Sequence, residues 1–171
     1  MKAGQNYSLT FALVLICQLF LSNYNCLGPY IMLTMLPTMI LCLPTGTGAV
    51  TTMLIAFGCG FATDLFAEGL LGLNVAALLP VAFCRKGLIR IFLGEDLIAR
   101  KDGFSIRKNG IVKISLAQVT ASAIFLAAYI FLDGAGTRPF WFCASKFFAS
   151  LGCCWILGLC VINTLTTDDR K

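Results

Sequence analysis

The sequence contains no histidine, which excludes the most common general base of enzymes and the most common metal ligand of proteins. Charged residues are also scarce, at 12% of the 171 residues, against about 25% in an ordinary soluble domain. Hydrophobic residues make up 58% of the chain, and its mean hydropathy is +0.87. Such a chain cannot cover itself with polar surface in water. We therefore expect residues 1–171 to form a single domain that is embedded in a lipid bilayer.

Motifs that carry chemistry are missing as well. No two of the nine cysteines have Cys-x-x-Cys spacing, and most of them lie in apolar runs, where free cysteine behaves as a small hydrophobic residue. A disulfide framework or a zinc site is not expected from these positions. The chain has no phosphate-binding loop, no carboxylate pair at a catalytic spacing and no serine–lysine constellation. These absences predict a protein that is not an enzyme and holds no cofactor or metal.

Six apolar runs follow one another along the chain, and we interpret each as a membrane-crossing segment. The second run is only fourteen residues long and contains Pro37, so we expect it to be kinked, tilted or partly re-entrant. The pattern predicts an all-α fold, a polytopic membrane helix bundle with about six transmembrane helices. The runs are Leu9–Leu21, Tyr30–Leu43, Ala49–Phe66, Leu70–Cys84, Ile114–Leu132 and Phe140–Leu165.

A basic segment over about residues 85–113 separates the fourth run from the fifth. It carries eight basic and three acidic residues, and this excess of five equals the net charge of the whole chain. Positively charged residues in short loops stay on the cytoplasmic side of a membrane. The segment is therefore predicted to be cytoplasmic, and an even number of crossings on either side of it places both termini in the cytoplasm.

The same segment has apolar residues at spacings of three to five, which suits a helix that lies on the membrane surface. Its cations would attract anionic lipid headgroups, at about 1 kcal/mol each. It could instead bind a cytoplasmic partner or act only as a topological anchor. Because the segment is tethered to the bilayer, nucleic-acid binding is not expected. The residues proposed for lipid or partner contact are Arg85, Lys86, Arg90, Arg100 and Lys101.

Asp64 is the sharpest polar feature of the apolar runs. A carboxylate at the centre of a membrane span costs about 2.5–3.5 kcal/mol on insertion scales, and less near the end of the span, where Asp64 lies. It is either a helix end that reaches interfacial water or a buried carboxylate. A buried carboxylate would fix the following loop or pair with a partner, and Lys146 is one internal candidate.

Glycines surround this carboxylate on both sides. Gly58 and Gly60 make a small-residue face, which serves either internal helix packing or the binding of a partner helix. After Glu68, Gly69 and Gly72 permit a positive φ, so a structured turn is expected. Asn74 can cap the next helix or form a hydrogen bond within the bundle.

These residues together resemble the MreD family of bacterial membrane proteins. The resemblance is carried by Leu36-Pro37, by Gly58-Cys-Gly-Phe-Ala-Thr-Asp64-Leu-Phe66 and by Gly69-Leu-Leu-Gly72-Leu-Asn74-Val-Ala76. A glycine-rich helix that ends in aspartate is followed by a Gly-x-Asn turn and then by a helix that leads into an arginine-rich segment. The similarity extends over about a third of the chain, from Pro29 to Arg90.

The resemblance implies a non-enzymatic, multi-pass protein of the bacterial inner (cytoplasmic) membrane. MreD-like proteins act with MreC, a RodA glycosyltransferase, a class B penicillin-binding protein and the MreB cytoskeleton to direct lateral peptidoglycan synthesis and cell shape. Taken with the reading of the residues above, the structural or partner-binding candidates are Pro37, Gly58, Gly60, Asp64, Glu68, Gly69, Gly72 and Asn74.

The resemblance also implies the fold of the substrate-binding subunits of ECF vitamin transporters, and this leaves an alternative function. A transporter subunit should line a pocket with polar groups near its outer face. The loops expected outside are short, and the apolar runs hold few polar side chains. A membrane scaffold is therefore favoured over a small-molecule transporter subunit, although a shared fold cannot separate them.

Overall fold

The computed structural model describes residues 3–23, 31–68, 71–94, 110–134 and 139–167. Over these residues the chain is helical and contains no β-strand, which confirms the all-α prediction. The elements are α1 (Ala3–Asn23), α2 (Leu36–Leu41), α3 (Ala49–Thr63), the π-helical turn η1 (Asp64–Glu68), α4 (Leu73–Leu93), α7 (Ile111–Gly134) and α8 (Phe140–Thr167).

Three helical segments are long and apolar enough to cross a membrane by length and composition: Ala49–Phe66, Ile111–Gly134 and Phe140–Leu165. The outer surface of the bundle is apolar as well, because large side chains such as Leu54, Phe83 and Phe131 are 66%, 70% and 78% exposed. These properties indicate a membrane protein. The described part of α1 adds a shorter apolar helix, Ser8–Asn23.

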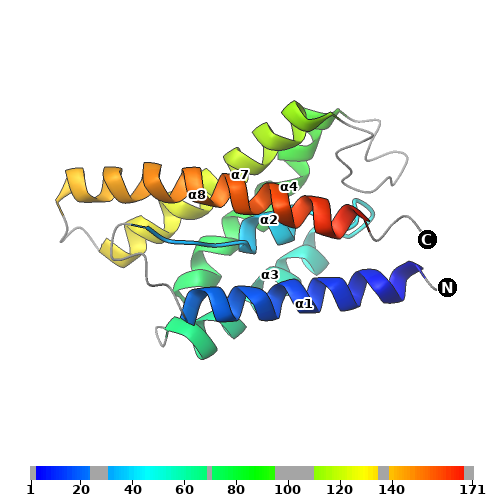
Figure 1. The fold of residues 1–171 in the computed structure, drawn as a ribbon, viewed down its shortest axis with the longest axis horizontal. Helices are drawn as coiled ribbons and strands as arrows, with labels where there is room; N and C mark the ends of the chain where they lie inside the picture. Colours follow the sequence, from blue (N-terminus) through cyan, green and yellow to red (C-terminus); the bar gives the residue numbers. More distant parts are fainter. Residues whose placement is uncertain (1–2, 24–30, 69–70, 95–109, 135–138, 168–171) are drawn as a thin grey trace.

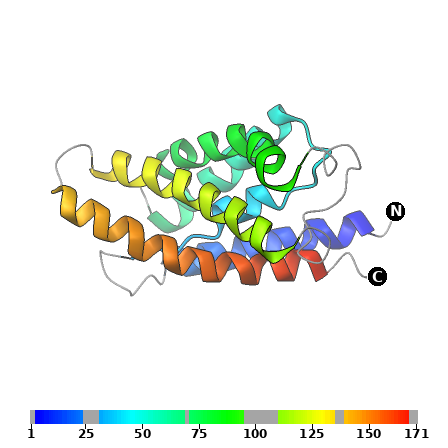
Figure 2. The ribbon, with the colours of Figure 1, turned by 90° about the horizontal axis from the view of Figure 1, so that it is seen from above.

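α1 and α8 lie along the long axis of the molecule, whereas α4 and α7 cross it obliquely (Figure 1). Successive long helices alternate in direction (Figures 1 and 2). The N- and C-terminal ends lie at the same end of the molecule, where α4 finishes and α7 begins. α4 occupies the middle of the bundle and packs most extensively against α3 and α7.

The second apolar run does not form a membrane-spanning helix. Residues 31–35 are non-helical and lead into α2, which has only six residues and is therefore about 9 Å long (Figure 1). Pro37 lies in the first turn of α2, where its missing N–H leaves no intrahelical bond unmade. Every residue of α2 is buried. The run is thus a broken segment in the interior of the bundle.

The fourth helix is longer than the apolar run predicts, because α4 continues to Leu93. Leu88 and Ile89 are buried on the face of α4 that carries the core, so this part of the basic segment is not a separate helix on a membrane surface. Gly94, with a φ of 90°, ends α4. The remainder of the basic segment, which includes Arg100 and Lys101, lies outside the described residues.

Candidate functional site

Asp64, the first residue of η1, is completely buried against the beginning of α4. Its carboxylate accepts hydrogen bonds from the backbone N–H of Gly72 at 2.9 Å, of Asn74 at 2.9 Å and of Val75 at 3.4 Å. The side-chain Nδ2 of Asn74 donates a fourth, at 3.0 Å. The first N–H groups of a helix lack intrahelical partners and lie at the positive end of its dipole. Asp64 therefore acts as the N-terminal cap of α4, although it belongs to the preceding helical segment.

The glycine before α4 explains why the cap comes from another element. Gly72 occupies the N-cap position with a φ of 98°, a left-handed conformation that suits glycine, and it has no side chain with which to cap. Gly72 has the positive φ that was expected of it. Of the two roles predicted for Asn74, the side chain takes the hydrogen bond within the bundle. Glu68 ends η1, but its side chain lies outside the described residues, as does the whole of Gly69.

The two glycines of α3 have different surroundings. Gly60 is buried, and a Cβ atom added there would lie 2.9 Å from both the Cα and the backbone nitrogen of Val75. Gly58 is exposed, and a Cβ atom there would meet nothing within 4 Å. Gly60 therefore permits the backbones of α3 and α4 to touch, whereas Gly58 lies on the outer surface.

We expect Gly60→Ala to destabilise the protein and Gly58→Ala to leave its stability unchanged or slightly raised. The new methyl group at residue 60 forces two backbones apart, and overpacking of this kind typically costs about 1–3 kcal/mol. Thermal unfolding of both variants in the same detergent is the measurement. Equal unfolding temperatures for the two variants would show that the contact at Gly60 does not limit the approach of α3 to α4.

Lys146 does not pair with Asp64. Its Nζ lies 3.1 Å from Oδ2 of Asp133, and 5.6 Å from the centre of the Tyr129 ring. Lys146 thus connects α8 to the end of α7. The expectation of a Lys146–Asp64 pair is wrong because backbone N–H groups already occupy both oxygens of the Asp64 carboxylate.

Arg85 forms a second buried junction, between α4 and the C-terminal end of α2. The side chain is 1% exposed. Its Nε donates to the carbonyl oxygen of Leu41 at 3.4 Å, and its Nη2 donates to the carbonyl oxygens of Leu43 and Pro44. Its Nη1 lies 3.2 Å from the hydroxyl of Thr47. Because the last carbonyls of a helix lack partners and carry its negative dipole end, a guanidinium group suits this position.

This position corrects one expectation for the basic segment. Arg85 lies inside the bundle and does not face lipid headgroups or the surroundings of the protein. Lys86 and Arg90, on the same helix, are exposed and remain accessible to such partners. The sequence contained one signal for the difference: Arg85 continues the spacing of the buried residues Leu78 and Ala82 along one face of α4.

The non-helical residues before α2 depend on side chains from other helices. The N–H of Met32 donates to Oγ of Ser150 at 2.9 Å, and the N–H of Met35 donates to Oε1 of Gln18 at 2.7 Å. The carbonyl oxygen of Met32 accepts from the thiol of Cys154 at 3.5 Å. Non-helical backbone at membrane depth persists only where such partners replace water. Sequence reasoning did not single out Gln18 and Ser150, although each is a polar residue in an apolar run.

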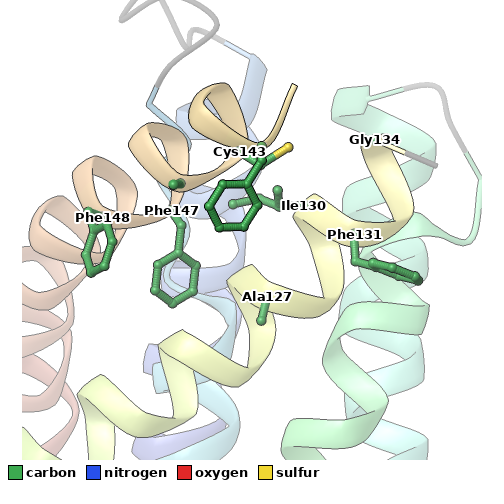
Figure 3. Close-up of a pocket in the computed structure, with 9 residues that line it drawn as sticks. Ala127, Ile130, Phe131, Gly134, Cys143, Phe147 and Phe148 are labelled. Carbon is green, nitrogen blue, oxygen red and sulfur yellow. The ribbon is translucent and has the colours of Figure 1, made fainter. Parts of the chain in front are cut away.

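A groove of about 470 Å³ opens between α7 and α8 (Figure 3). Ile130 on α7 and Phe147 on α8 are turned toward the space between the two helices. Its lining is apolar apart from one thiol: Ala127, Ile130, Phe131, Gly134, Phe140, Cys143, Ala144, Phe147 and Phe148. The groove therefore offers no charged group or hydroxyl to a polar ligand.

No family model, no curated protein and no solved structure matches this chain. The described residues also contain no group of three histidine, cysteine, aspartate or glutamate side chains that could hold a metal ion. The fold defines the class of this protein: over the described residues it is all-helical, with three helices long and apolar enough to span a membrane and a short broken segment buried between them. The two charged groups that are fully buried in the described core, Asp64 and Arg85, bind the start of α4 and the C-terminal end of α2.

Proposed function

We propose that this chain is a non-enzymatic membrane scaffold of the MreD type, which binds an MreC-like partner and helps to direct lateral peptidoglycan synthesis and cell shape. One observation carries the proposal. Four of the residues on which the MreD resemblance rests, Gly60, Asp64, Gly72 and Asn74, meet at the junction of α3 and α4. Gly60 lies against α4 at Val75, and Asp64 binds Gly72 and Asn74. These contacts connect two helices rigidly, and a rigid connection suits a scaffold because a partner then binds a surface of fixed shape.

The arrangement of charge supports a scaffold over an enzyme or a transporter subunit. Both oxygens of Asp64 accept backbone N–H groups, and the guanidinium of Arg85 is directed at carbonyl oxygens. Groups engaged in this way are poorly placed to bind or transform a substrate. The α7–α8 groove is apolar, which suits a lipid chain or a neighbouring helix better than a polar vitamin.

We place the protein in the bacterial inner membrane with both termini in the cytoplasm. The two termini and the C-terminal end of α4 lie at one end of the molecule, and the exposed Lys86 and Arg90 lie toward this end of α4. Cations beside a membrane stay preferentially on the cytoplasmic side. These two residues are also the described candidates for contact with anionic lipids.

The outer face of α3 is the surface that we assign to the MreC-like partner. Large apolar side chains recur along it at spacings of three or four residues, and the rings of Phe57 and Phe61 stack with their centroids 6.1 Å apart. Gly58 lies between them in the sequence and is open on its outer side. A transmembrane helix can approach closely at such a glycine. The exposed residues of this face are Val50, Leu54, Phe57 and Phe61 on α3, and Leu65 continues it on η1.

Copurification tests the function. The tagged chain is expressed in its native host, extracted in a mild detergent and recovered with its bound proteins, which mass spectrometry identifies. Recovery of an MreC-like protein with a RodA-like glycosyltransferase and a class B penicillin-binding protein is the expected result. Recovery of ATPase subunits with a membrane coupling subunit would instead establish the transporter alternative.

Gly58→Leu is expected to reduce recovery of the MreC-like partner at least several-fold without lowering the amount of protein in the membrane. A leucine there projects from the outer surface and blocks close approach of a partner helix, while the interior of the bundle is unchanged. Gly152→Leu on α8 is the matched control, because Gly152 is also exposed with nothing within 4 Å of its added Cβ. If both variants recover equal amounts of the MreC-like partner, the outer face of α3 is not its binding surface.

A further inference from the structure

Three buried polar atoms near the centre of the bundle have no hydrogen-bond partner among the described residues. They are Oγ1 of Thr38 on α2, Oε1 of Gln118 on α7 and Oγ of Ser122 on α7. The relative exposures of the three residues are 0%, 0% and 1%. A buried polar group of this kind is rare in a folded protein, because losing water without gaining a partner is unfavourable.

Two of the three groups meet in the fold, and the third lies one turn further along α7. Gln118 and Ser122 are four residues apart on α7, so their side chains are neighbours on the same face. A Cβ atom added to Gly158 on α8 would lie 1.7 Å from Nε2 of Gln118 and 2.7 Å from Oγ1 of Thr38. The glutamine amide and the threonine hydroxyl therefore meet over the same glycine. We call Thr38, Gln118 and Ser122 the central polar cluster.

The orientation of the glutamine amide is fixed by the backbone of α8. Its Nε2 donates to the carbonyl oxygens of Cys154 and Trp155, each at 3.1 Å. Both amide hydrogens are thereby used, and Oε1 is left as a pure acceptor. The two hydroxyl groups of the cluster can each donate and accept.

We propose that the central polar cluster is a binding site for buried water, which connects α2 to α7. The ligand must donate a hydrogen bond to Oε1 of Gln118 and must also exchange hydrogen bonds with the hydroxyls of Thr38 and Ser122. Water does both, and a buried water molecule needs two to four polar partners of this kind. This site is separate from the α3 surface to which the proposed function assigns a partner.

The charges near the cluster favour a neutral ligand over an ion. None of the three side chains is ionisable, so none compensates the charge of a bound ion. The guanidinium of Arg85 already occupies the carbonyl of Leu41, three residues after Thr38, and it disfavours a cation nearby. An anion is disfavoured by Oε1 of Gln118, which can only accept a hydrogen bond.

Thr38→Val tests the proposal, because valine keeps the shape of threonine and removes its hydroxyl. In the full-length protein in detergent, we expect the unfolding temperature to fall by about 2–4 °C, since the water loses a partner. Ser122→Ala should lower it similarly, and the double variant by less than the two shifts together, because both changes act on the same water. Thr164→Val is the control, since the Thr164 hydroxyl donates to the Cys160 carbonyl of its own helix and is exposed.

The opposite sign would overturn the proposal. If no ligand binds, Thr38→Val deletes an unpartnered buried hydroxyl, and the unfolding temperature should rise. A high-resolution experimental structure of the unmodified protein gives a second test that does not depend on the variants. Density for water within about 2.7–3.2 Å of the Thr38 hydroxyl and of Gln118 Oε1 supports the site. A direct hydrogen bond between these two side chains, or density for an organic molecule, contradicts it.

Discussion

Replacing Arg85 with methionine is expected to destabilise the protein by about 3–6 kcal/mol, because it removes two buried hydrogen bonds from a charged group, which contribute about 1.5–3 kcal/mol each. The guanidinium serves the carbonyls of Leu41, Leu43 and Pro44 at once. Methionine fills a similar volume but donates no hydrogen bond, so the buried carbonyls of Leu41 and Leu43 would lose this donor. The carbonyl of Pro44 would keep its hydrogen bonds from Thr47. Thermal unfolding in detergent measures the loss.

Lys86→Met is the matched control for this variant. Lys86 is the next residue on the same helix and is exposed, so its replacement should change stability by no more than about 0.5 kcal/mol. Arg85→Lys should fall between the two, because an ammonium group keeps the charge but cannot reach several carbonyls in the planar arrangement of a guanidinium. Similar unfolding temperatures for the Arg85 and Lys86 variants would contradict the assignment of Arg85 as the group that holds α2.

Asp64→Asn is expected to destabilise the protein by about 2–4 kcal/mol, through the loss of charge-assisted hydrogen bonds. An asparagine has the shape of aspartate, but it presents an NH₂ group where the carboxylate accepts from backbone N–H groups. This NH₂ group must therefore face either the donors of Gly72 and Val75 or those of Asn74, and the donors that it faces lose their acceptor. The start of α4 should unfold first, and limited proteolysis between α3 and α4 should show it.

Asp133→Asn is the control for the carboxylate charge. Asp133 pairs with Lys146 while 19% exposed, and partly exposed ion pairs contribute about 1 kcal/mol or less. Comparison of the two variants separates a general effect of removing a negative charge from the loss of the α4 cap. If Asp64→Asn unfolds at the temperature of the unaltered protein, the capping role assigned to Asp64 is wrong.

Hydrophobic runs predicted four helices well, namely α1, α3, α7 and α8, because long apolar runs are the sequence pattern of membrane-spanning helices. The runs Ala49–Phe66 and Phe140–Leu165 coincide with segments that are able to cross a membrane, and α7 exceeds its run by only a few residues. The runs also located α1. Their success is physical: a continuous apolar run of this length has few alternatives to a helix.

The broken segment and the end of α4 were not predictable in the same way. α2 is short because residues 31–35 find hydrogen-bond partners on α1 and α8, and one of these, Ser150, is 118 residues away in the sequence. α4 continues past Cys84 because Arg85 is compensated by carbonyls about 40 residues earlier. From the sequence alone, a charged residue is taken to end an apolar run, because the distant groups that compensate its charge are not known.

The candidate site was predicted in part. The sequence placed Asp64, Gly72 and Asn74 in one motif, and left open whether the carboxylate was buried or reached water. Burial follows from the backbone path: the turn brings the first N–H groups of α4 back to Asp64. The internal role of Gly60 and the outward position of Gly58 also required the orientation of the helix, because residues two positions apart in a helix point in nearly opposite directions.

Asp64 contacts residues that are close to it in the sequence, whereas Met32 contacts residues that are far away, so the two sets of contacts form at different times during synthesis. Asp64 binds residues only 8 to 11 positions ahead, so α3 and α4 can form a capped hairpin as soon as both have left the ribosome. The backbone of Met32 is satisfied by residues 118 and 122 positions away. The segment before α2 must therefore wait for α8, which is synthesised after the other described helices, before its hydrogen bonds are complete.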